Sequence, residues 1–239
     1  MANFPFQRLQ SDLAALIART PAGQRLISEP DLAKQMGVSR ATLREAMRTF
    51  ETQGIIRRRQ GSGTYVVGKV PVIDAGLEVL ESLETMARRM DLEITVSDLL
   101  VELIQADEET AKGLGVPDGT RLTRIRRVMR ADGRPAAYLI DTLPESILEP
   151  ADLPADFSGS VLDFLIARGN KLSVSRAVIG ATNAPTDVAK PLEIQRDDVL
   201  LQFESQLFDS KSTIIDYSVS YFIPGYFHFH VNRRIGNSK

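Results

Sequence analysis

The chain has 239 residues, enough for two modest domains, and its 43% hydrophobic and 25% charged residues are ordinary values for a globular protein. No run approaches the ~18 uncharged apolar residues of a membrane-spanning helix, and the first residues lack the pattern of a signal peptide. The absence of Cys excludes disulfides, thiolate zinc sites and cysteine nucleophiles, and it favours a cytoplasmic location.

The formal charge is divided unevenly along the chain. Residues 1–69 contain 11 Lys and Arg against 5 Asp and Glu, a balance of +6, whereas residues 70–239 contain 18 against 26, a balance of -8. A basic first segment joined to an acidic remainder indicates a polyanionic partner for the first segment alone.

Two helical patterns open the basic segment. Residues 7–19 carry apolar side chains at the spacing of one helix face. After a Pro- and Gly-containing break, Ser28 is placed to cap a second, short helix, with Asp31 three positions later. Gly37 then suits a tight turn, because a residue without Cβ can adopt a positive φ.

A third helical pattern begins after Ser39, which can cap it. The face opposite its apolar side carries Arg40, Arg44 and Arg48 at positions i, i+4 and i+8. In helix-turn-helix docking, the start of such a helix approaches the bases, and Arg can donate two hydrogen bonds to guanine there. Taken alone, the stripe is more typical of a solvated charged face.

A basic hairpin pattern follows the third helix. Strand patterns at 55–59 and 64–67 flank the turn at 60–63, Gln-Gly-Ser-Gly. Its glycines let backbone N–H groups approach a sugar-phosphate wall, and the arginines at 57–59 can neutralise phosphates. Such a turn is weak evidence for DNA binding on its own. After a capped helix-turn-helix, it predicts a winged helix-turn-helix that binds duplex DNA.

Several motifs of this segment carry a family resemblance: Ser28-Glu29, Leu32-Ala33, Gly37-Val38-Ser39-Arg40, Thr42-Leu43-Arg44-Glu45-Ala46, Gly54 and Gln60-Gly61-Ser62-Gly63-Thr64. On these motifs, residues from about 5 to 68 resemble the N-terminal domain of the GntR family of bacterial transcriptional regulators. The resemblance implies operator contacts by Arg40, Arg44 and the wing glycine. Relatives usually have a DNA-contacting Arg where this chain has Pro30, so one contact is expected to be absent and the operator sequence to differ. The expected DNA-binding residues are Ser28, Ser39, Arg40, Thr42, Arg44, Arg48, Gly61, Ser62 and Gly63.

The rest of the chain mixes helical and strand patterns. Residues 69–76, with a Pro, are expected to form a linker, and helical spacing follows over 77–90. Asp-Gly within 131–135 predicts a hairpin between strands at 122–130 and 136–143. Further strands are expected at 101–104, 172–181, 199–209, 212–222 and 227–233, and short helices at 108–114, 161–166 and 185–192.

The order of these patterns resembles UTRA, the effector-binding domain of the HutC subfamily of GntR regulators, which has a chorismate-lyase-like fold. The resemblance spans roughly residues 75–235. It is carried by Arg127-x-x-x-Ala131-Asp132-Gly133-x-Pro135, Leu143-Pro144, the helix near 161–165, and Tyr217-x-x-x-Tyr221 with Phe227 and Phe229. The expected fold class is α+β with an antiparallel sheet, divided into a winged helix-turn-helix domain at 1–68, the linker at 69–76 and a UTRA-like domain at 77–239.

The resemblance implies a small metabolite lying against the sheet, with Arg127 binding its anionic group. Met129 and Leu139 replace an Arg and a Glu of sugar-phosphate-binding relatives, which argues for a smaller carboxylate or an aromatic acid. Alternation along 212–222 places Asp216 and Ser218 on one strand face, either a pocket wall or a solvent-facing edge. The expected effector contacts are Arg127, Glu204, Asp216, Ser218 and Tyr221.

The two histidines of the chain, His228 and His230, lie two positions apart on one strand face. Two imidazoles can contribute to a metal site, but the sequence shows no third ligand, so neither a metal nor another cofactor is expected. No Ser-His-Asp arrangement, phosphate loop or paired-carboxylate motif supports a hydrolase or a kinase.

The sequence therefore predicts a transcriptional repressor that is not an enzyme. It is expected to bind a pseudo-palindromic operator as a homodimer and to leave it when a small anionic metabolite binds. Two alternatives stay open: an enzyme that uses the lyase-like second domain, and a constitutive DNA-binding protein whose pocket is vestigial.

Overall fold

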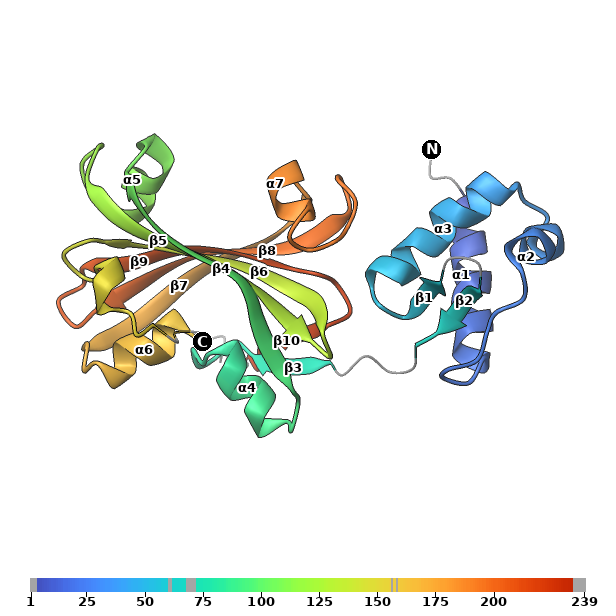
Figure 1. The fold of residues 1–239 in the computed structure, drawn as a ribbon, viewed down its shortest axis with the longest axis horizontal. Coiled ribbons are helices and arrows are strands. Elements are labelled where there is room, and N and C mark those ends of the chain that lie inside the picture. Colours follow the sequence, from blue (N-terminus) through green and yellow to red (C-terminus); the bar gives the residue numbers. More distant parts are fainter. Residues whose placement is uncertain (1–3, 60–61, 68–71, 156, 158, 234–239) are drawn as a thin grey trace, which may run out of the picture. The chain divides into compact units, whose positions relative to one another are not determined.

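The computed structural model describes residues 4–59, 62–67, 72–155, 157 and 159–233. The chain forms two compact units, one made of residues up to Val72 together with Pro224–Tyr226, and the other made of the remaining residues from Ile73 onward (Figure 1). No helix formed by the described residues is long and apolar enough to cross a membrane.

The first unit is a three-helix domain with a small hairpin. Its elements are α1 (Phe4–Arg19), α2 (Glu29–Met36), α3 (Arg40–Thr52), β1 (Ile56–Arg59) and β2 (Gly63–Val66). Its core forms because each helix contributes one apolar stripe, and Leu13, Leu32 and Leu43 are fully buried there. The two strands pair antiparallel, with Ile56 opposite Val66.

Local capping sets the boundaries of α2 and α3, as the sequence predicts. The Ser28 hydroxyl accepts a hydrogen bond from the Asp31 N–H at 3.3 Å, and the Ser39 hydroxyl accepts one from the Thr42 N–H at 3.1 Å. Gly37 ends α2 with φ +67°, the left-handed conformation that closes the helix and turns the chain toward α3. The predicted helix-turn-helix with a wing is confirmed.

The second unit is built on an antiparallel sheet of six strands in the order β4-β5-β6-β9-β8-β7. The strands are β4 (Ile94–Gln105), β5 (Arg121–Ala131), β6 (Arg134–Pro144), β7 (Leu172–Asn183), β8 (Val199–Asp209) and β9 (Ile214–Phe222). Asp132 and Gly133 both have positive φ, which is the backbone that a tight hairpin between β5 and β6 requires. The expected α+β class is confirmed.

Short helices cover both faces of this sheet. They are α4 (Leu83–Arg89), α5 (Glu108–Leu114), α6 (Val161–Ala167) and α7 (Thr186–Ala189), with a 3-10 turn at Pro150–Asp152. Helices α5 and α7 lie on one side of the sheet, and α4 and α6 on the other (Figure 1). Leu114 of α5 packs with Leu122 and Tyr217, whereas Leu165 of α6 packs with Ile125 and Leu143.

Two expectations for the start of this unit are wrong. Residues 73–76, assigned to the linker, form β3 (Ile73–Gly76), which pairs in parallel with β10 (Phe227–His230). The helix expected from residue 77 begins only at Leu83, because the Ser82 hydroxyl caps it by accepting a hydrogen bond from the Thr85 N–H at 3.0 Å. Residues 68–71 lie outside the described part of the chain.

Candidate functional site

The N-terminal end of α3 presents the side chains expected to approach DNA. Arg40, at its first position, is exposed, and the Arg44 side chain is 55% exposed. Arg48 is less accessible, at 31%, and lies 3.6 Å from a carboxylate oxygen of Glu45. Arg40 and Arg44 are therefore the stripe members that can reach a duplex most directly.

A single carboxylate, Glu29, organises the basic side chains of this unit. Its oxygens lie 2.6 Å from Arg44 Nε and 3.1 Å from Arg58 Nε. These ion pairs join the start of α2 to α3 and to β1, so Glu29 fixes where the two guanidinium groups stand. The neighbouring Ser28 is half-buried and Ser39 caps α3, so both hydroxyls already have partners within the chain.

The wing is held by contacts near its tip. The Ser62 and Tyr65 hydroxyls lie 2.7 Å apart, and the Arg59 guanidinium lies 4.9 Å from the centre of the Tyr65 ring. Gly63 has φ +115°, which favours glycine, and a Cβ there would also displace the Arg25 guanidinium, whose Nε would be only 2.4 Å away. Arg25, which the sequence did not single out, thus adds a cation beside the wing, while Gly61 lies outside the described residues.

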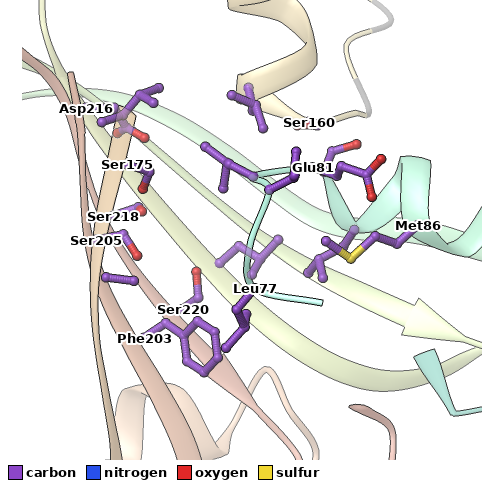
Figure 2. A pocket seen from close by; sticks show the side chains of 18 of the residues that line it. Leu77, Glu81, Met86, Ser160, Ser175, Phe203, Ser205, Asp216, Ser218 and Ser220 are labelled. Carbon is purple, nitrogen blue, oxygen red and sulfur yellow. The ribbon is translucent and has the colours of Figure 1, made fainter. Parts of the chain in front are cut away.

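The second unit contains a cavity of about 680 Å³ on the side of the sheet that carries α4 and α6. One wall is the sheet itself; the other is the segment from Gly76 to Met86 together with α6. Figure 2 shows Phe203, Ser205, Ser218 and Ser220 on the sheet side, facing Leu77 across the cavity. This volume suits a small metabolite.

Serine side chains line much of this cavity. On the sheet, Ser205 of β8 stands opposite Ser218 of β9, and Phe203 stands opposite Ser220. Apolar side chains fill the spaces between, so the wall offers hydroxyl groups on an otherwise apolar surface. The serines that line it are Ser82, Ser160, Ser173, Ser175, Ser205, Ser218 and Ser220.

Arg127 lies at the cavity within a cluster of carboxyl groups. It is only 4% exposed, and its guanidinium is ion-paired with Asp141. Burial alone would lower the pKa of Arg127, but the attraction of Asp141 raises it, so the charge is retained. Burial, followed by repulsion from Asp141, raises the pKa of Asp216 well above its ordinary value.

Two polar atoms of this cluster have no hydrogen-bond partner among the described residues. They are the donor Arg127 Nε and the acceptor Glu84 Oε1, both buried. Burial raises the pKa of Glu84, and the attraction of Arg127 opposes that change. Because buried polar groups in native proteins are nearly always paired, these atoms mark where ligand atoms can bond.

The structure places two of the expected effector contacts elsewhere. Glu204 and Tyr221 point to the opposite face of the sheet, where the Tyr217 hydroxyl donates a hydrogen bond to Glu204 Oε1 at 2.9 Å. The reason is strand alternation: Glu204 stands opposite Val219, one step out of phase with Ser205 and Ser218. Arg127, Asp216 and Ser218 do line the cavity.

Two family models match the chain in succession. The model described as bacterial regulatory proteins, gntR family, matches residues 6–66. The model described as the UTRA domain matches residues 89–228, more than half of the chain. The chain belongs to the gntR family. It is a ligand-responsive transcriptional regulator of the HutC type, with a DNA-binding winged helix-turn-helix domain and a UTRA effector domain.

Known relatives of this gntR-family regulator span most of its length. It is 29% identical over 200 residues to the HTH-type transcriptional repressor NagR of Bacillus subtilis (strain 168). The matched region covers 82% of this chain and 79% of that protein. It is 30% identical over 200 residues to the probable transcriptional regulator PhnF of Escherichia coli (strain K12), which covers 83% and 82%. The crystal structure of PhnF from Mycobacterium smegmatis has a TM-score of 0.65 at 21% identity, covering 95% of this chain and 100% of that one, a likeness of fold.

Proposed function

We propose that this regulator is a homodimeric repressor that leaves its operator when a small metabolite binds in the cavity of the UTRA domain. The cavity supports this proposal most directly, because it presents unpartnered polar atoms in a unit separate from the DNA-binding one. A metabolite shifts operator binding only if it binds the two states of the protein with different affinity. Since the proposed operator is duplex DNA, the protein is expected to act in the cytoplasm.

In the DNA-binding unit, the proposed contacts to the operator are Arg40, Thr42, Arg44 and the wing. Arg40 is the sharpest case, because it is exposed at the first position of α3, where a side chain can reach base edges. Arg48 and the hydroxyls of Ser28 and Ser39 are proposed to assist, although each already has a partner within the chain.

The test is operator binding by the full chain. Duplex DNA selected from a randomised pool would be titrated with the parent protein, with Arg40→Ala and with Arg8→Ala, a charge-matched control on α1. Arg40→Ala is expected to lose about 1–3 kcal/mol of preference for the selected sequence over random duplex. The Arg8→Ala control should keep that preference, and an unchanged preference in Arg40→Ala would remove Arg40 from the recognition surface.

The charges of the cavity bear on the effector. The predicted anionic group would meet Arg127, but that guanidinium is already paired with Asp141. Five carboxyl groups line the cavity against this one described basic residue, namely Glu78, Glu81, Glu84, Asp141 and Asp216. An anion would gain little from a guanidinium that already has a carboxylate partner, so we propose an effector whose polar end donates hydrogen bonds, as amines and hydroxyls do.

A homodimer is supported by the edges of the sheet. The outermost strands, β4 and β7, expose apolar side chains that a monomer would leave in water: Leu100 and Leu103 are 46% and 48% exposed, and Val174 and Val178 are both 58% exposed. Exposed apolar edge strands are sites of pairing with another chain. Light scattering on the full chain should give twice the chain mass; a monomer at micromolar concentration would exclude this part of the proposal.

The protein is proposed to bind its effector without converting it. The relatives NagR and PhnF are named as regulators, which supports binding without turnover. The enzyme alternative rests on buried carboxyl groups with a raised pKa, such as Asp216, because such groups can serve acid–base chemistry. Metabolites that stabilise the protein in a thermal-shift screen would be incubated with it and recovered for mass spectrometry. Unchanged recovery is expected, whereas turnover would favour the enzyme alternative.

A further inference from the structure

Three side chains with metal-binding atoms converge where β3 pairs with β10. Asp74 of β3 and His228 and His230 of β10 each place one ligand atom within 4.8 Å of the other two. The register sets Asp74 beside His228, and the two histidines share a face because they are two positions apart on a strand. Asp74 and His228 are 154 positions apart in the sequence.

The distances within this cluster suit a small metal ion. Asp74 Oδ1 lies 3.0 Å from His228 Nδ1 and 3.2 Å from His230 Nδ1. Neighbouring ligand atoms around a tetrahedral zinc ion are roughly 3.3 Å apart, given metal–ligand bonds of about 2 Å. The two distances from Asp74 are thus close to those of a coordination sphere, and the two histidine atoms lie within 4.8 Å of each other.

Hydrogen bonding between Asp74 and the histidines accounts for only one of the two contacts. His228 Nδ1 shares a hydrogen bond with Asp74 Oδ1. His230 Nδ1 is buried and makes no hydrogen bond with any described residue, although the same oxygen is near. A metal ion between the three groups would give this nitrogen the partner that it lacks.

The other side of the His230 ring has a carboxylate close by. A Cβ at Gly76 would lie 2.8 Å from Glu78 Oε2 and 3.5 Å from His230 Nε2, so the missing side chain leaves both atoms room on that side. Metal-bound histidines usually donate their second ring N–H to a carboxylate or a carbonyl, which orients the ring. Glu78 Oε1 already accepts a hydrogen bond from the Asn232 N–H, so its other oxygen would have to move closer to play that part for His230.

We propose that Asp74, His228 and His230 bind a divalent transition-metal ion, with Zn²⁺ as the best match. Two imidazoles and one carboxylate are ligands that Zn²⁺ accepts, and three protein ligands leave one position for water. All three side chains reach solvent, with exposures of 56%, 72% and 37%, so the ion can enter the folded protein.

Such an ion would cross-link β3 and β10. These strands pair over only four positions, and an isolated two-stranded pairing is marginal in water. Gly76 of β3 and Phe229 of β10 also line the effector cavity. Metal binding is therefore expected to stabilise one end of that cavity and to raise the melting temperature of the protein.

Calorimetric titration tests the proposal. Full-length protein without an affinity tag would be stripped with chelator and titrated with Zn²⁺. One ion per chain is expected, and Asp74→Ala and His228→Ala should each weaken binding by about tenfold or more. Asp118→Ala, which removes an exposed carboxylate from a loop outside the cluster, is the matched control and should bind like the parent. Circular dichroism checks that each variant is folded.

Proton NMR gives a second readout, because the chain has only two histidines. Zn²⁺ should shift the ring signals of both His228 and His230 with the same one-to-one titration. The proposal is overturned if Zn²⁺ does not bind, if both variants bind like the parent, or if the two ring signals do not shift together. Operator binding is not needed for either measurement, so the result is independent of the regulatory function.

Discussion

Asp216 is a carboxyl group whose surroundings favour the protonated form. It is 6% exposed and accepts a hydrogen bond from the Thr142 N–H at 3.1 Å, which alone does not offset the loss of water and the nearness of Asp141. A carboxyl with a raised pKa in the folded protein holds its proton to higher pH than the unfolded chain does. The contribution of Asp216 to stability is therefore fully present below the ordinary pKa of an Asp carboxyl and is lost as the pH rises through its raised pKa.

As the pH rises from the ordinary pKa of an Asp carboxyl to the raised pKa of Asp216, the free energy of unfolding is expected to fall. Asp216→Asn should remove much of this fall, because the amide has no proton to lose. Urea denaturation of the full chain from about pH 4 to about pH 8 measures it. Asp118→Asn is the control and should keep the slope of the parent; the same slope in Asp216→Asn would contradict the interpretation.

Gly37 shows how one backbone position sets the geometry of two helices. Its N–H and that of Val38 bond to the carbonyls of Lys34 and Ala33 at 3.2 and 3.0 Å, which closes α2 and directs the chain into α3. A Cβ at this position would have nothing within 4 Å, so any penalty comes from the φ of +67° alone.

Gly37→Ala should therefore lower the free energy of unfolding by about 1 to 2 kcal/mol. Gly37→Asn should cost less, because Asn adopts the left-handed conformation more readily. Gly180→Ala, on β7, is a control with open space and an ordinary φ, and it should change stability little. Equal losses for Ala and Asn in urea denaturation of the full chain would argue against a conformational cause.

The elements that the sequence predicts well are those set by nearby residues. The Ser39 cap, the turn at Gly37 and the Asp-Gly hairpin at 132–133 each depend on positions within about one turn, and all three form as expected. The helix expected from residue 77 failed because the spacing of Leu77 and Leu80 that suggested it belongs to a non-helical segment lining the cavity.

Features that depend on distant pairing could not be read from the sequence. Strand alternation correctly predicts that Asp216 and Ser218 share one face, but the register between β8 and β9 decides that Ser205 joins them and Glu204 does not. The partner of Arg127 is Asp141, which lies on the neighbouring strand β6 and which no motif marks in the sequence. The sequence places Asp74 in a linker, because its pairing with β10 depends on residues at the other end of the chain.

Operator and effector binding must influence each other equally in the whole protein. If the effector lowers operator affinity by a given factor, the operator lowers effector affinity by the same factor, because both are legs of one thermodynamic cycle. A factor of about 5 to 150 is typical of such coupling. Anisotropy titrations of labelled operator, with and without a stabilising metabolite, measure the change in operator affinity. Calorimetry of the metabolite, with and without operator, measures the change in metabolite affinity. A metabolite that changes neither affinity would be a ligand but no inducer.

The Glu29 carboxylate occupies two arginines of the DNA-binding unit, Arg44 and Arg58, in the way that a DNA phosphate would. By holding Arg44 and Arg58 at 2.6 and 3.1 Å, it keeps two cations in place while cancelling one of their charges. Glu29→Gln should free that charge, tighten binding to any duplex and steepen its salt dependence, while preference for the selected operator falls. Salt titrations on operator and random duplex would show both changes. The expected consequence is that Glu29 shortens the time that the regulator spends on DNA other than its operator, because it lowers the net positive charge of the DNA-binding unit.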